Sequence, residues 1–169
     1  MVFVLAAVGA VRAQDFLPEF VGVRGGFSTS GQGAANFIQA EGFADWNLPL
    51  KTESDSGWFL QTKLSLSVGW LDSAGANAVI GTAGPAFALG KRRFPLSLEW
   101  GISPTLISRY QFDTVNLGQS FQFTSYLGLN LDLSRHWRVG YRYQHMSNGG
   151  LADSNTGLNL NMFALSYAF

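Results

Sequence analysis

The sequence contains no cysteine, few charged residues and no long apolar run beyond its N-terminal segment. The absence of cysteine excludes disulfide frameworks and thiolate metal sites. Charged residues make up 13% of the 169 residues, and the formal net charge is zero. The chain therefore lacks the basic surface that a nucleic-acid partner requires. No later stretch reaches the roughly 18 consecutive apolar residues that mark a transmembrane helix.

The first 13 residues differ in kind from the rest. An apolar run from Val2 to Val11 precedes Val11-Arg12-Ala13, which resembles a signal-peptidase cleavage site. The run is too short to span a bilayer as a helix, and it lacks the usual basic start. We predict a signal peptide over residues 1–13 and a single domain over residues 14–169. A disordered or buried N-terminus is the alternative.

Strict alternation of apolar and polar residues dominates the remainder of the chain. In one segment Leu96, Leu98, Trp100 and Ile102 alternate with Ser97, Glu99, Gly101 and Ser103. This period of two indicates strands with one apolar and one polar face. The pattern predicts eight strands, at residues 16–28, 35–48, 57–71, 77–90, 94–104, 118–133, 136–147 and 158–169.

The composition of the polar strand faces indicates which way the apolar faces point. The polar faces are rich in glycine, serine, glutamine and charged residues, which suits a narrow polar lumen better than a solvated exterior. We expect a lumenal polar network of Glu41, Asp45, Lys63, Glu99, Asp132, Arg138 and Arg142. Tryptophans near the segment ends resemble membrane-interface girdles, and the alternating aromatic C-terminus resembles that of bacterial outer-membrane barrels.

These features predict an all-β fold, an eight-stranded antiparallel transmembrane β-barrel of the bacterial outer membrane. A soluble lipocalin-like barrel is the alternative. An even strand number leaves both termini in the periplasm. The connections around 29–34, 72–76, 105–117 and 148–157 then face outward.

The seventh predicted strand ends with two side chains that are unusual on a lipid-facing surface. His145 and Ser147 share the parity of Tyr141 and Tyr143, so they point outward at the extracellular end. Polar groups facing lipid lose their water partners and are rare without a function. Residues two apart on a strand lie roughly 6.5–7 Å apart on one face. Their side chains can close that gap, which allows His145 to act as general base toward Ser147.

The hairpin contains His145-Met146-Ser147-Asn148-Gly149-Gly150-Leu151, Asn155 and Gly157, with Asn116-Leu117-Gly118 and Ser120-Phe121 before it. These residues resemble the active site of the PagL family of lipid A 3-O-deacylases. The resemblance implies an eight-stranded outer-membrane barrel that hydrolyses the ester-linked acyl chain at position 3 of lipid A, without a metal or cofactor. It also implies lipopolysaccharide as substrate, His145 as base and Ser147 as nucleophile.

One position departs from the family. The family's third catalytic residue is a glutamate fourteen residues after the histidine, and Asn159 stands there. With a hairpin centred near residue 152, Asn159 lies opposite His145, and its amide oxygen can accept the Nδ1 hydrogen. Asp153 is the alternative acid.

Donors for the oxyanion are expected in the loop after Ser147. The glycine-rich run lets backbone N–H groups turn toward the reaction centre, and an asparagine amide is a further donor. The candidates are Asn148, Gly149, Gly150 and Asn155. His136, in a periplasmic turn, cannot meet His145, so no metal site is predicted. A non-catalytic barrel with a structural or binding role remains the competing interpretation, and a homodimer is compatible with the sequence.

Overall fold

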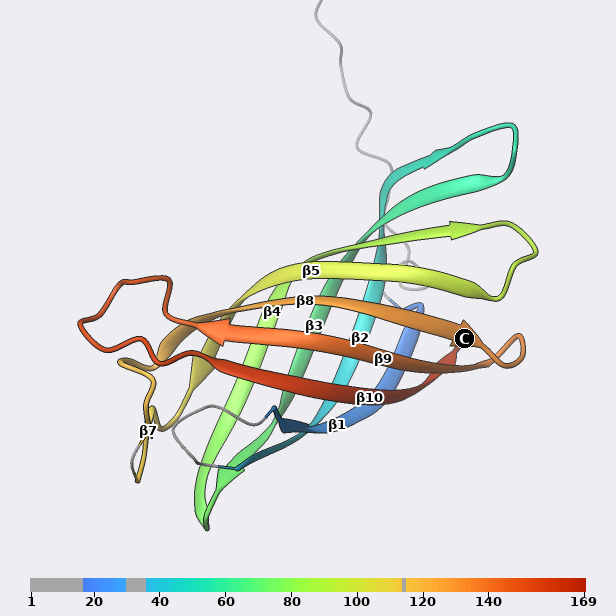
Figure 1. Cartoon of the computed structure of the whole chain (residues 1–169). Helices are drawn as coiled ribbons and strands as arrows, with labels where there is room; N and C mark the ends of the chain where they lie inside the picture. The colour runs from blue at the N-terminus through green and yellow to red at the C-terminus, as the bar shows by residue number, and fades with distance from the viewer. Residues whose placement is uncertain (1–16, 30–35, 114) are drawn as a thin grey trace, which may run out of the picture.

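The computed structural model describes residues 17–29, 36–113 and 115–169 as one closed barrel of eight antiparallel strands (Figure 1). The predicted signal peptide lies outside the described residues. The barrel strands are β1 (Phe20–Ser28), β2 (Phe37–Glu53), β3 (Trp58–Ser73), β4 (Ala76–Lys91), β5 (Leu96–Ile107), β8 (Phe121–Asp132), β9 (Trp137–Ser147) and β10 (Leu158–Ala168). They follow the order β1-β10-β9-β8-β5-β4-β3-β2 around the barrel. The predicted fold class is confirmed.

Most predicted strand boundaries are shifted by a few residues, and two departures are larger. The second strand was expected to stop at residue 48, but β2 continues to Glu53 through a register shift between Asn47 and Lys51. Pro49, which has no N–H to donate, lies inside this irregularity, where a β-bulge tolerates it. The connection expected at 105–117 contains a short hairpin, β6 (Gln111–Phe112) and β7 (Val115–Asn116).

The outward face of the barrel is apolar. Val23, Val68, Leu106 and Leu127 are each more than half exposed, while the residues between the outward positions are mostly buried. Such exposed apolar area is costly in water and suits a hydrocarbon environment. Among the described residues, no helix is long and apolar enough to cross a bilayer.

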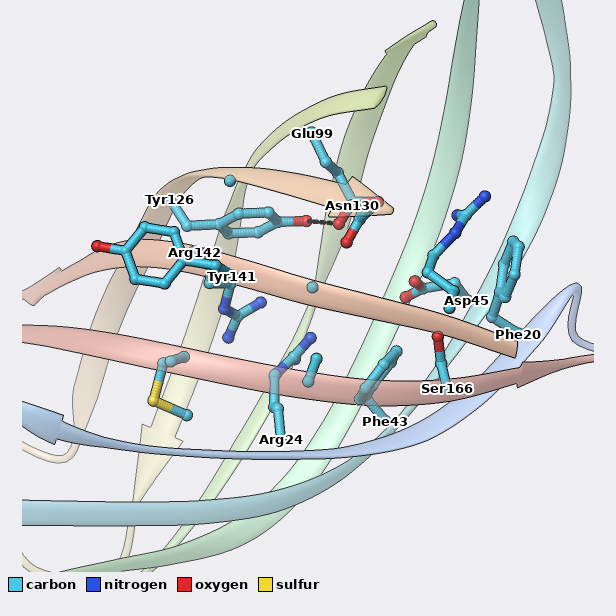
Figure 2. A pocket seen from close by; sticks show the side chains of 15 residues that line it. Phe20, Arg24, Phe43, Asp45, Glu99, Tyr126, Asn130, Tyr141, Arg142 and Ser166 are labelled. Carbon is cyan, nitrogen blue, oxygen red and sulfur yellow. Dashed lines mark hydrogen bonds between the residues drawn. The ribbon is translucent and has the colours of Figure 1, made fainter. Parts of the chain in front are cut away.

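The lumen near the chain termini is filled by buried ion pairs. Glu41 accepts from both Arg24 and Arg142, and Lys63 Nζ donates to Glu99 Oε2 at 3.1 Å. Figure 2 shows the side chains of Arg24, Glu99 and Arg142 inside the barrel, with the Tyr126 hydroxyl donating to Glu99 at 3.3 Å. The cavity left between them is about 30 Å³, which is too small for a channel. Two residues of the expected network, Arg138 and Asp132, form an ion pair of their own beside the periplasmic turns, with Nε and Oδ1 2.5 Å apart.

The other half of the lumen holds a large apolar cluster beside buried polar side chains such as Gln39, Gln122 and Gln144, which differs from the polar lumen expected throughout. Its buried side chains come from strand ends and from the β6–β7 hairpin, and include Phe37, Leu71, Ile80, Ile107, Phe112, Val115, Leu117, Met146, Leu158, Leu160 and Met162. The hairpin folds its apolar residues over the barrel mouth, so the adjacent lumenal positions bury apolar area against it. We call the mouth opposite the chain termini the outer end.

Candidate functional site

The connection between β9 and β10 lies at the outer end, opposite the labelled C-terminus (Figure 1). Gln144 and Met146 are fully buried in the lumen. The alternation of the strand therefore turns His145 and Ser147 to the outer surface, where the former is exposed and the latter half-buried. The two side chains share one face at the end of the barrel that the hairpin closes.

Asn159 is the residue of β10 that pairs with His145 across the antiparallel ladder. The imidazole Nδ1 and the amide Oδ1 lie 2.7 Å apart, a short hydrogen bond. An amide oxygen can only accept, so this contact places a hydrogen on Nδ1, and in the neutral ring Nε2 is then the nitrogen that can accept a proton. The register thus gives His145 a defined orientation and the tautomer that a general base needs.

Ser147 lies two residues after His145 on β9, opposite Phe123 of β8. Within the described part of the chain its hydroxyl has no hydrogen-bond partner, His145 included. Because the two residues are neighbours on one face, rotation about their side-chain bonds can bring Oγ to Nε2. Geometry of this kind commonly tightens only when substrate is bound.

Asn148 fixes the start of the loop. It is fully buried, and its amide donates to the backbone oxygens of Leu117 at 3.1 Å and Ser154 at 2.6 Å. Its own N–H donates to Asn155 Oδ1 at 3.1 Å, and its Oδ1 accepts the Gly150 N–H at 2.9 Å. Asn148 therefore holds the loop together rather than offering a free donor.

Two of the four predicted oxyanion candidates keep an unused donor. The Asn148 and Gly150 N–H groups are engaged inside the loop. Among the residues described, the Gly149 N–H and the Asn155 amide nitrogen make no hydrogen bond. Gly149 has a φ of 66°, in the left-handed region that glycine adopts at little cost. These two groups are the remaining candidates for stabilising a negative oxygen near Ser147.

The sequence analysis missed a clamp between this loop and the one before β8. Ser154 and Thr156 hydroxyls both donate to the Asn116 backbone oxygen, at 2.9 and 3.0 Å. Gly118 has a φ of 91°, and a Cβ built there would lie 2.0 Å from the Ser154 oxygen. Only glycine permits this approach. Asn116-Leu117-Gly118 is a recognisable turn sequence, but it does not predict which loop it contacts.

Gly157 leaves space beside the free edge of the imidazole. Its φ is 67°, and a Cβ added there would lie 3.0 Å from His145 Cε1 and 3.8 Å from Nε2. A side chain at this position would crowd the ring on the side that takes up a proton. Asp153 is exposed and contacts no charged partner among the described residues. His136 lies at the other end of the barrel, with Nδ1 3.2 Å from the Ala168 oxygen.

A family profile described as "Lipid A 3-O-deacylase (PagL)" matches residues 40–168. The chain belongs to the PagL family. The match extends over most of the barrel and contains the whole β9–β10 hairpin. Family membership and the barrel fold identify the chain as an outer-membrane β-barrel.

Two PagL proteins are similar to this chain over different extents. The lipid A deacylase PagL of Bordetella bronchiseptica is 36% identical over 72 residues, which cover 43% of this chain and 40% of that relative. The crystal structure of the outer membrane enzyme PagL superposes with a TM-score of 0.75 at 20% identity, over 88% of this chain and 99% of that one. The second likeness establishes a shared fold.

Proposed function

We propose that this barrel is a lipid A 3-O-deacylase that hydrolyses an ester-linked acyl chain by a Ser/His mechanism on its lipid-facing surface. The observation that carries the proposal is the 2.7 Å contact between His145 Nδ1 and Asn159 Oδ1, on the same outward face as Ser147. A histidine that is oriented by a hydrogen bond and lies beside a hydroxyl is the arrangement that nucleophilic acyl transfer requires.

The position of Ser147 along the membrane normal supports a substrate whose ester group lies at the boundary of the apolar layer. Ser147 lies ten positions along β9 from Trp137, an exposed aromatic at the periplasmic end. At about 3.4 Å per residue and a tilt of about 40°, this separation is about 26 Å along the membrane normal. The apolar band of such barrels is about 25 Å tall. The ester groups of an outer-leaflet lipid lie at that depth, with their acyl chains below.

In the proposed reaction, Ser147 Oγ attacks the ester carbonyl carbon while His145 Nε2 takes the hydroxyl proton. The imidazolium that forms is held by Asn159 Oδ1, and the oxyanion is stabilised by the Gly149 N–H and the Asn155 amide. His145 then returns the proton to the departing sugar oxygen as the ester bond breaks. Water from the outer interface hydrolyses the acyl-serine, again with His145 as base, and releases a fatty acid.

Mass spectrometry of lipid A from cells with and without the protein tests the function. We expect loss of one ester-linked acyl chain in cells that contain the wild type, and none in cells with Ser147→Ala or His145→Ala. Folded-barrel mobility on gels is the control for both variants. Unchanged lipid A in all strains, with the wild type folded, would favour a structural or binding barrel instead.

A further inference from the structure

The outward face carries a second polar pair, separate from the His145 site and deeper in the apolar surface. The Tyr141 hydroxyl donates to Asn161 Oδ1 at 2.7 Å. Both residues alternate with buried lumenal positions, Arg142 and Met162, so both point outward. Because Oδ1 accepts the phenol hydrogen, the amide is oriented with Nδ2 left as a free donor. No described residue accepts from it.

The surroundings of this amide are aromatic. Asn161 pairs with Tyr143 on β9 and with Phe27 on β1, both of which are exposed. Phe163 follows on the same face, with its ring centroid 5.4 Å from that of Tyr141 and 6.5 Å from that of Phe27. None of these neighbours accepts a hydrogen bond from the Asn161 amide nitrogen among the described residues.

The depth of Asn161 makes that free donor costly. Its partner Tyr143 is six positions along β9 from Trp137 (143 − 137). The same rise and tilt as for Ser147 put it about 16 Å above the periplasmic aromatics, well inside a band about 25 Å tall. Water is scarce at that depth, and a polar group facing lipid without a partner is destabilising. The oxygens of a bound lipid are the acceptors that this surface leaves open to the amide.

We propose that Asn161 and Tyr141 form a lipid-binding subsite, in which Asn161 Nδ2 donates to an oxygen carried in the acyl region of a bound lipid. The acceptor is an ester or amide carbonyl, or a hydroxyl on an acyl chain. Tyr141 holds the amide in the donating orientation. The subsite lies below His145 on the neighbouring strand, so it would align the acyl portion of a lipid whose ester reaches Ser147. The alignment of an ester with Ser147 rests on the proposed function, whereas lipid binding at Asn161 does not.

Binding to the inactive full-length barrel tests the subsite. Ser147→Ala and Ser147→Ala/Asn161→Leu are compared by native mass spectrometry in micelles doped with purified lipid A, and separately with a diacyl phospholipid. One lost hydrogen bond predicts about 5–10-fold weaker binding of the lipid that supplies the oxygen. Loss for lipid A alone identifies an oxygen particular to it, and equal loss for both lipids identifies an ordinary ester carbonyl. Leu165→Ala, an outward change lower on β10, is the control and should leave affinity unchanged.

A stability measurement separates binding from a purely structural role. If the pair served only to brace the barrel, Asn161→Leu would lower the unfolding midpoint in lipid-free detergent. The subsite predicts an unchanged or raised midpoint, because leucine suits this surface better than an amide. In the Ser147-containing protein, Asn161→Leu should raise KM with little change in kcat. Unchanged affinity for both lipids, or a lowered midpoint that accompanies the loss, would overturn the proposal, whether or not Ser147 proves to be the nucleophile.

Discussion

Asn159 offers a test in which activity should rise rather than fall. Its amide oxygen already lies 2.7 Å from His145 Nδ1, but an amide carries no charge to oppose the imidazolium that forms when Ser147 attacks. Replacing it with glutamate introduces the residue that the resemblance led us to expect there, and Asn159→Asp puts a carboxylate in nearly the same place as the present amide. Both variants should accelerate deacylation.

The size of the gain follows from the exposure of the site. Opposite charges about 4 Å apart attract by about 1 kcal/mol in water and about 4 kcal/mol at an effective dielectric constant of about 20. His145 is exposed, so the gain should lie in the lower half of this range. About 1.4–2.7 kcal/mol of transition-state stabilisation corresponds to a 10–100-fold increase in rate. The loss of about 10⁴ known for a triad aspartate changed to asparagine is an upper limit set by a buried site.

The assay is the initial rate of fatty-acid release from purified lipid A in detergent, with the barrel confirmed as folded. Asn159→Gln is the matched control, because it has the length of glutamate without the charge, and it should show no gain. If neither acidic variant exceeds the wild type, the inferred electrostatic role of this position is wrong.

Asn159→Ala should lower any wild-type rate of fatty-acid release, because it removes the acceptor that orients His145. Asp153→Ala should leave that rate nearly unchanged, because the Asp153 side chain is exposed in the loop. The opposite result, a slow Asp153→Ala and an unchanged Asn159→Ala, would make Asp153 the partner of His145. Glu41→Gln should lower the free energy of unfolding by on the order of 3 kcal/mol, since Arg24 and Arg142 lose their shared buried counter-charge. Asp132→Asn, at a pair whose carboxylate is 41% exposed, should cost under about 1 kcal/mol in the same urea titration.

The strand pattern was readable from sequence because lipid and lumen impose opposite polarities on alternate residues. The outward parity of His145 and Ser147 follows from it, as does the pairing of Asn159 with His145 once the hairpin centre is set. Local alternation carries this information without any knowledge of distant parts of the chain.

Features that depend on contacts between distant segments were not readable. The apolar half of the lumen exists because Phe112, Val115 and Leu117 fold over the mouth, and nothing in their local sequence says so. The Asn148 amide likewise reaches Leu117, 31 residues away in the loop before β8, as well as Ser154 of its own loop. That engagement decides which N–H groups stay free, so the oxyanion candidates could be narrowed only with the structure.

Covalent capture of Ser147 is the most direct test of the central claim. The purified, folded barrel in detergent is treated with a long-chain alkyl fluorophosphonate, digested, and mapped by mass spectrometry. The account predicts a single adduct on Ser147 that is lost in His145→Ala and forms faster in Asn159→Glu. An adduct on another serine, or equal labelling of Ser147 in wild type and His145→Ala, would contradict it.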